Sequence, residues 1–154
     1  MSAEVFVDTN VLVYCRDASE PHKQPEAQEW VERLWRERRG RISTQVISEY
    51  YVTVTRKLSP GLSPDAARRE LRLLLAWRPL SINTALIEEA WRIEERFQLS
   101  WWDAMIVAAA RQSGCRWLLT EDLQDGQDLD GLVVVDPFAH PPDSLPGRAP
   151  PLSV

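Results

Sequence analysis

An apolar, strand-forming segment near the start of the chain carries one carboxylate at its centre. Val5–Tyr14 reads VFVDTNVLVY, and Asp8 interrupts a run that is otherwise typical of a strand buried in a parallel sheet. We predict a strand here, with Asp8 at the carboxyl edge of the sheet, where open α/β sheets bind their ligands. An ionised carboxylate in such a place is costly unless it is partnered. The simpler alternative is that Asp8, Thr9 or Asn10 caps a following helix.

The composition is that of one folded domain. The chain has 154 residues, of which 44% are hydrophobic, enough to bury a core. Its longest purely apolar run, residues 104–110, is too short to span a membrane, and the N-terminus does not resemble a signal peptide. Cys15 and Cys115 form no disulfide framework, so we expect reduced, buried thiols in a cytoplasmic protein. The net charge of −5 argues mildly against a nucleic-acid partner, but acids that surround divalent cations would change that balance.

Helical and strand patterns alternate along the rest of the chain. Apolar stripes and cap residues predict helices over residues 26–38, 45–58, 64–77, 84–97 and 101–113, and short strands over 41–44, 80–82, 117–119 and 132–135. This alternation predicts one α/β domain with a mainly parallel sheet over residues 1–138. Six of the eleven prolines lie from Pro137 onward, which favours an extended or disordered tail over residues 139–154.

Three further acids are candidates for a role beyond solvation, and each also has a simpler explanation. Asp122 follows a predicted buried strand, at the same sheet edge as Asp8, although an acidic loop would also account for it. Asp103 begins a helix that is apolar almost all round, so its first turn faces the interior or a cleft; Ser100 and Asp103 also fit a capping box. Glu49 lies early in its helix among polar neighbours, where a solvated helix face is an adequate explanation.

The four acids are more informative together than singly. In a doubly wound sheet, strand ends and the first turns of neighbouring helices can converge on one edge. Two carboxylates about 4 Å apart repel by roughly 4 kcal/mol at an effective dielectric near 20, so four ionised ones need cations or shared protons. Oxygen ligands without a neighbouring histidine or cysteine select hard cations, Mg²⁺ or Mn²⁺. A site of this type can direct water against a phosphodiester.

Four segments together resemble PIN-domain proteins of the VapC type, which are toxin ribonucleases of bacterial toxin–antitoxin pairs. The segments occur in the family's order and at its usual separation, and the resemblance extends from the start of the chain to about Phe138. They are VFVDTNVLVY at Val5–Tyr14, TQVISEYYVTVTRK at Thr44–Lys57, LSWWDAMIVAAA at Leu99–Ala110 and LLTEDLQDGQDLDGLVVVDPF at Leu118–Phe138.

The resemblance implies a three-layer α/β/α sandwich and a cluster of acids that binds Mg²⁺ or Mn²⁺. The four acids of the family motif match Asp8, Glu49, Asp103 and Asp122. Asp8, Asp103 and Asp122 would be metal ligands, with Glu121 as a competitor for the place of Asp122. Small polar residues match positions that support the acids; they are Thr9, Asn10 and Thr120. One departure is Asp136, where relatives often carry asparagine.

The function implied is a metal-dependent endoribonuclease in which Glu49 orients the attacking water, accepts its proton, or supports the metal ligands from outside. The resemblance also implies a homodimer and a cognate antitoxin that occupies the cleft. The densest basic run would supply contacts to RNA through Arg36, Arg39 and Arg41, although a solvated helix face explains these arginines equally well. Trp101 and Trp102 could stack on unpaired bases, but we expect core packing for at least one of them.

Three other functions are compatible with the sequence. A phosphatase or dehalogenase would also place an aspartate nucleophile after its first strand, but such enzymes usually have a second acid two residues on, where this chain has Asn10. A DNA-directed nuclease would use the same acids. The third alternative is a catalytically idle module that binds metal or RNA. Substrate and metal-binding assays separate these alternatives.

Overall fold

A five-stranded sheet with the strand order β2-β1-β3-β5-β4 forms the centre of the protein. The computed structural model describes residues 4–145. Its strands are β1 (Val5–Val7), β2 (Gly40–Arg41), β3 (Trp117–Leu119), β4 (Asp128–Leu129) and β5 (Leu132–Val135). Its helices are α1 (Thr9–Tyr14), α2 (Lys23–Glu37), α3 (Thr44–Arg56), α4 (Pro64–Leu74), α5 (Thr84–Phe97) and α6 (Trp101–Gln112). Single 3-10 turns are η1 (Leu75–Trp77) and η2 (Pro142–Ser144).

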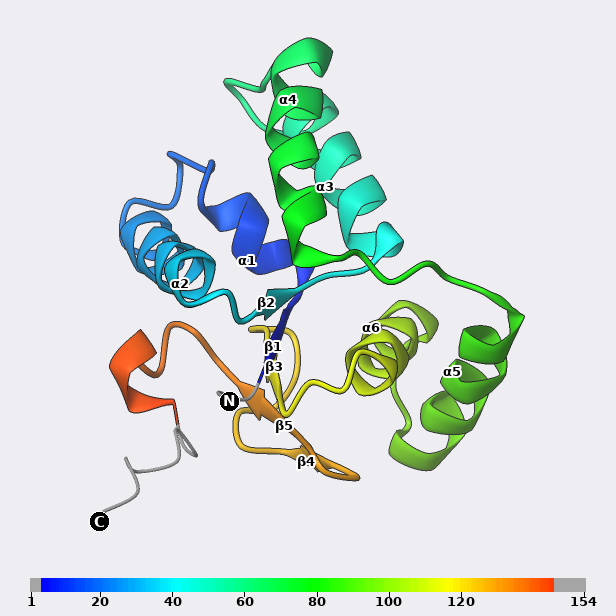
Figure 1. Cartoon of the computed structure of the whole chain (residues 1–154). Coiled ribbons are helices and arrows are strands. Elements are labelled where there is room, and N and C mark those ends of the chain that lie inside the picture. The colour runs from blue at the N-terminus through cyan, green and yellow to red at the C-terminus, as the bar shows by residue number, and fades with distance from the viewer. Residues whose placement is uncertain (1–3, 146–154) are drawn as a thin grey trace.

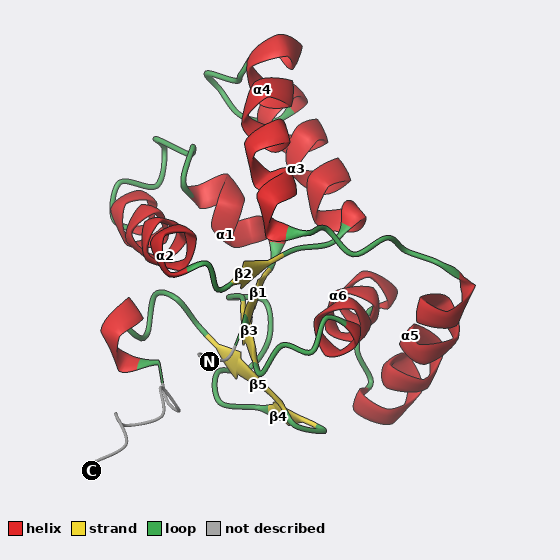
Figure 2. Cartoon of the chain, in the orientation of Figure 1, coloured by secondary structure: helices red, strands yellow, loops and turns green. Residues whose placement is uncertain are grey.

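Helices cover both faces of this sheet. Figure 1 shows α1 and α2 on one side and α5 and α6 on the other, while α3 and α4 pack together beyond the β2 edge. Figure 2 separates the central strands from the surrounding helices by colour. Strands β2, β1, β3 and β5 are parallel, and β4 runs antiparallel to β5. The predicted α/β fold with a mainly parallel sheet is therefore confirmed.

The register of the sheet brings distant parts of the chain to one edge. Val7 pairs with Leu119, so Asp8 and Thr120 leave the sheet side by side. The backbone N–H of Asp8 donates to the carbonyl of Leu119 over 3.0 Å, which continues the ladder by one step. All residues of β1 and β3 are buried, as expected where helices cover both faces.

The predicted strand over Val5–Tyr14 is wrong in its second half. The strand ends at Val7, and Thr9–Tyr14 forms α1. Asp8 is the N-cap of this helix and accepts a hydrogen bond from the Thr9 backbone N–H over 2.7 Å. The error has a physical cause, because a short apolar run suits a buried strand and a buried helix equally well.

Other element boundaries differ from the prediction where polar side chains cap helices. Strand β2 is shorter than the predicted 41–44, because Ser43 caps α3 by accepting from the Val46 N–H. The predicted strand 80–82 is reduced to a single bridge between Ser43 and Leu80. The sequence analysis missed β4, which is joined to β5 by Asp130 and Gly131, both with positive φ. An Asp-Gly pair is the usual signal for such a hairpin turn.

The first part of the predicted tail packs against α2. Trp30 Nε1 donates to the carbonyls of Pro137 and His140, each over 3.0 Å. Arg33 forms an ion pair with Asp143 at 2.6 Å, and Leu145 is buried in the core. Residues 139–145 thus belong to the packed domain. Residues 146–154 lie outside the described residues, so for them the extended or disordered tail stays a prediction.

Within residues 4–145, no helix is both long enough and apolar enough to cross a lipid bilayer.

Candidate active site

Asp8 is the most enclosed acid of the site. Its side chain is 6% exposed, and both of its oxygens are engaged. Oδ1 accepts from the Thr9 N–H, while Oδ2 accepts from Thr120 Oγ1 at 2.9 Å and from Asn10 Nδ2 at 3.3 Å. Burial raises the pKa of Asp8 to about 7. The hydrogen bonds from Thr120 and Thr9 act in the opposite direction, and the negative charge of Asp122 adds to the rise. Without a cation nearby, this carboxylate is therefore expensive to ionise.

Asp103 reaches the same place from the first turn of α6. Ser100 caps this helix, and its Oγ accepts from the Asp103 N–H over 3.2 Å. The remainder of α6 is almost wholly buried, so its N-terminus is held against the sheet edge. Partial burial raises the pKa of the Asp103 carboxyl, and the nearby charge of Asp122 acts in the same direction.

Asp122 completes a group of three carboxylates. One oxygen from each of Asp8, Asp103 and Asp122 lies within 4.8 Å of the others. Asn10 Nδ2 donates to Asp122 Oδ2 at 3.0 Å and to Thr120 Oγ1 at 3.1 Å, and it also reaches Asp8. Asn10 and Thr120 thus link the ends of β1 and β3, and their role as residues that support the acids stays a prediction.

Glu49 lies beside this group without belonging to it. Its Oε1 accepts from Thr9 Oγ1 over 3.4 Å, so α1 and α3 are linked through the site. Partial burial raises the pKa of Glu49, and the charges of Asp103 and Asp122 raise it further. All four acids line one open pocket of about 390 Å³. The sequence prediction that they converge on one sheet edge therefore agrees with the geometry.

The Glu121 side chain makes its contacts outside the group of three carboxylates. Its Oε2 pairs with Lys23 Nζ at 2.8 Å, and its Oε1 accepts from the Tyr14 hydroxyl. A carboxylate neutralised by a lysine has less to offer a metal ion. Of the two adjacent acids, Asp122 is therefore the one placed for the site, a distinction that the sequence left open.

The predicted arginines do not line the acidic pocket. Arg39 and Arg41 flank the start of β2, whereas the acids gather where the parallel strands end. Arg39 is buried and pairs with Glu37 at 3.2 Å, and Arg41 pairs with Glu4 at 3.2 Å. The expectation that these two would lie near the cleft is therefore wrong. Arg36 is exposed near the end of α2, and a role in RNA binding stays a prediction for all three.

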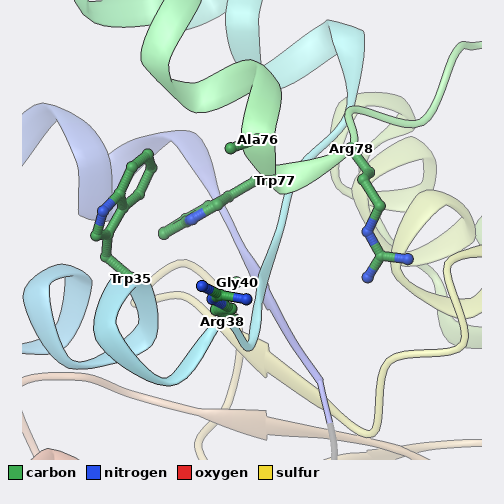
Figure 3. Close-up of a pocket in the computed structure, with 6 residues that line it drawn as sticks. All are labelled: Trp35, Arg38, Gly40, Ala76, Trp77 and Arg78. Atoms are coloured by element: carbon green, nitrogen blue, oxygen red, sulfur yellow. The ribbon is translucent and has the colours of Figure 1, made fainter.

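A second pocket, of about 470 Å³, opens beside the start of β2. Figure 3 shows Trp35 and Trp77 next to each other, with Gly40 and Arg38 below Trp77 and the Arg78 side chain pointing away. The two indole rings lie 5.8 Å apart, and Arg78 is held by Glu4 at 2.6 Å. No carboxylate is among the described residues that line this pocket, so it offers no metal site.

Sequence reasoning missed Gln45, and it assigned no role in the site to Asp136 or to the two cysteines. Gln45 lines the acidic pocket one helical turn before Glu49, a spacing of four that could have revealed it. Asp136 accepts from the Phe138 N–H over 2.9 Å, which explains its place in the turn after β5. Burial raises the pKa of Cys15 and of Cys115 to about 12, so neither is a thiolate at neutral pH.

Comparisons with known proteins add a family and a fold. The sequence model of the PIN domain matches residues 5–125, a range that contains all four acids. A search of curated protein sequences gave no significant match.

Two examples illustrate the similarity of the chain to solved structures. A toxin–antitoxin complex from Klebsiella pneumoniae matches with a TM-score of 0.62 and 20% identity, over 87% of this chain and 98% of that chain. The VapC20 toxin of Mycobacterium tuberculosis, described as cleaving the sarcin–ricin loop, matches with a TM-score of 0.58 and 24% identity, over 75% of this chain and 87% of that chain. At these identities the likeness establishes the fold.

Proposed function

The chain belongs to the PIN domain family, and from this premise we propose that it is an endoribonuclease that uses Mg²⁺ or Mn²⁺ to hydrolyse RNA. One observation carries the proposal. Asp8, Asp103 and Asp122 come from three distant parts of the chain, yet place carboxylate oxygens within 4.8 Å of one another. Like charges so close together repel unless a cation or a proton lies between them.

The donor set fits a hard divalent cation. The three carboxylates offer only oxygen, which Mg²⁺ and Mn²⁺ prefer. Asn10 uses its Nδ2 to hold Asp8 and Asp122, and its buried Oδ1 has no hydrogen-bond partner among the described residues, so this oxygen is available to a ligand. When bound, the metal would lower the pKa of an attacking water and offset charge on the phosphate.

The chain's own residues would supply positioning and proton transfer. Thr120 and Asn10 hold the Asp8 and Asp122 carboxylates in place through the hydrogen bonds described above. Glu49 would orient the water and accept its proton at a carboxylate oxygen, a role that its raised pKa suits. The cysteines take no part, because their thiols remain protonated.

The biological setting that we propose is a type II toxin–antitoxin pair. One of the two structures named above is described as a toxin–antitoxin complex, and the other as a toxin that cleaves the sarcin–ricin loop. By extension, this chain would be a cytoplasmic toxin that forms a homodimer, and a cognate antitoxin would restrain it. Single-stranded or looped RNA is the favoured substrate, because its bases can be splayed out from the strand.

The proposal is tested by cleavage of single-stranded RNA with and without Mg²⁺ or Mn²⁺. Asp103→Asn should lower the cleavage rate at least about 100-fold, since loss of a ligand costs more than loss of a supporting residue. Glu121→Gln is the matched control. It removes a neighbouring carboxylate that is paired with Lys23, and it should cleave at close to the wild-type rate.

Three results would contradict the proposal. They are cleavage by Asp103→Asn at the wild-type rate, cleavage that survives a chelator, and metal binding by the wild-type protein without any cleavage of RNA. The last would point to an idle binding module. DNA of the same sequence, tested in parallel, separates a DNA-directed nuclease. Thermal unfolding of each variant shows whether it is folded.

A further inference from the structure

A groove continues from the acidic pocket along α3. It has a volume of about 470 Å³ and shares four lining residues with the pocket, namely Gln45, Glu49, Thr53 and Trp102. The remaining lining residues are Thr44, Ser48, Val52, Lys57, Ile82 and Met105. We call this surface the α3 groove. Because the acidic pocket and the α3 groove share these lining residues, an RNA strand whose phosphate lies at the acids would extend into the α3 groove.

Trp102 presents an uncovered indole where the two hollows meet. Its side chain is 62% exposed, directly before Asp103 in the chain. The adjacent Trp101 is half-buried and packs against Trp91 with ring centroids 6.3 Å apart. Trp102 makes no ring contact with any residue that the structure describes. A large apolar face left open beside an active site suits a base that stacks on it.

Gln45 provides an acceptor that has no partner. Its side chain is 7% exposed, and its Nε2 donates to the Trp102 carbonyl over 3.3 Å. Its Oε1 is buried, and no hydrogen-bond donor within residues 4–145 reaches it. A buried acceptor without a donor is unfavourable, so a ligand with an N–H or O–H group would gain by filling this place.

Lys57 provides positive charge at the far end of the α3 groove. It is exposed, and the described part of the chain gives its ammonium no ion pair. Lys57 lies twelve residues after Gln45, about 18 Å along the helix axis, so it would meet a phosphate further along the same strand. No lysine or arginine is among the described residues that line the acidic pocket, so Lys57 in the α3 groove brings a positive charge that the acidic pocket itself lacks.

We propose that the α3 groove binds the single-stranded RNA that flanks the scissile phosphate. Trp102 stacks on a base, Gln45 Oε1 accepts a hydrogen bond from a ribose 2′-hydroxyl or a base amine, and Lys57 contacts a phosphate. The inference rests on the proposed function, from which it takes RNA as the ligand. It adds the path of the substrate and the residues that hold it.

The test measures RNA binding apart from cleavage. Each variant is made in an Asp8→Asn background, and the fluorescence anisotropy of a labelled single-stranded RNA gives its Kd. Trp102→Ala should weaken binding about 10-fold, within the range reported for loss of one stacked base. Trp102→Phe, which keeps an aromatic ring, should restore most of the affinity. Trp91→Ala is the matched control, because Trp91 is 56% exposed on α5 and does not line the α3 groove.

A second arm identifies the donor that Gln45 meets. The Kd of Gln45→Ala is compared for RNA, for DNA of the same sequence, and for strands rich in cytosine or in uracil. A loss confined to RNA assigns the 2′-hydroxyl, and a larger loss for cytosine than for uracil assigns the base amine. An equal loss for all strands overturns the role of Gln45.

The outcomes also separate this inference from the proposed function. If Trp102→Ala binds RNA as tightly as its parent, or no more weakly than Trp91→Ala, the α3 groove is not the path of RNA. That result would not contradict metal-dependent cleavage by the wild-type protein. If Trp102→Ala instead bound a protein partner more weakly, the α3 groove would be assigned to that partner. If the wild-type protein binds RNA through Trp102 but does not cleave it, the inference stands and the proposed function fails.

Discussion

Asp8 performs two tasks with two oxygens. Oδ1 caps α1 through the Thr9 N–H, and Oδ2 faces Thr120 and Asn10 at the acidic pocket. The sequence offered capping and chemistry as alternatives for this residue, but the geometry makes them compatible. The free-energy cost of ionising this buried carboxyl group appears in its pKa, which burial raises to about 7. A carboxylate that must ionise in such surroundings weakens the fold unless something positive accompanies it.

The metal-free protein should therefore lose stability as the pH rises. The pKa of Asp8 is near 3.8 in the unfolded chain and about 7 in the fold, so between these values the folded state binds more protons. The free energy of unfolding then falls with increasing pH, by up to about 1.4 kcal/mol for each pH unit in this window. Urea unfolding from pH 4 to pH 8 in the presence of a chelator measures this slope.

The Asp8→Asn variant isolates the contribution of this one carboxyl group. Asparagine does not titrate, so the variant should show a flatter profile and should be more stable than the wild-type protein at pH 8. An unchanged slope in Asp8→Asn would assign the pH dependence to the other acids of the pocket, Asp103 and Glu49, whose pKa values are also raised.

At the scale of secondary-structure elements, short polar N-cap side chains help to fix the positions of acids in the helices that follow them. Ser43, Asn83 and Ser100 cap α3, α5 and α6, and in each case a side-chain oxygen accepts from a backbone N–H three residues on. The cap at Ser100 has an added consequence, because the N–H that it receives belongs to Asp103. The hydrogen bond that caps α6 therefore also anchors the backbone of a candidate ligand.

Ser100→Ala should lower both stability and activity. Loss of a serine N-cap costs about 1 kcal/mol, which is about 3 °C in Tm for a chain of this size. Activity should fall by more than the Tm explains, because Asp103 loses its anchor. Ser63→Ala is the matched control, since Ser63 caps α4 in the same way and does not line the acidic pocket. Equal cleavage rates in the two variants would show that the Ser100 cap is purely structural.

At the scale of the whole molecule, the candidate metal site joins three distant parts of the chain. Asp8 follows β1, Asp103 begins α6 and Asp122 follows β3. An ion held by all three would bind the folded state and not the unfolded chain, so it would stabilise the fold by mass action. Since Asp103 and Asp122 flank the α6–β3 unit, the ion would also fix that unit against β1.

Mn²⁺ should accordingly raise the Tm of the wild-type protein. At a free concentration 100 times the Kd, the stabilisation is about 2.7 kcal/mol, which corresponds to roughly 8 °C. Asp103→Asn should lose most of this increase, and Glu121→Gln should keep it. Differential scanning fluorimetry across a titration of Mn²⁺ measures both. A Tm that does not respond to Mn²⁺ or Mg²⁺ would contradict the metal assignment.

Much of the fold followed from local patterns. The α/β class, the parallel sheet and the cap at Ser100 were readable, because each depends on residues close together in the chain. The end of β1 was not readable, since Asp8 could interrupt a strand or begin a helix. The hairpin at Asp130 and Gly131 carried a signal in its Asp-Gly pair that the prediction passed over.

The site was harder to predict where the role of a residue depends on contacts with residues far away in the sequence. Nothing local distinguishes Glu121 from Asp122; the distinction comes from Lys23, far away in sequence, which pairs with Glu121. Arg39 and Arg41 were candidate RNA contacts in a basic run, but both lie where β2 begins, away from the strand ends that carry the acids, and they pair there with Glu37 and Glu4. Only the assembled sheet shows which edge a residue occupies.

The strand order has a consequence for how the protein is made. The middle strand β3 lies between β1 and β5 but is encoded late, and Asp122 comes just after it. A nascent polypeptide interrupted before this point lacks both the central strand and one acid. Premature termination would therefore release inert fragments, and a ribosome must translate nearly the whole domain before a competent centre can exist.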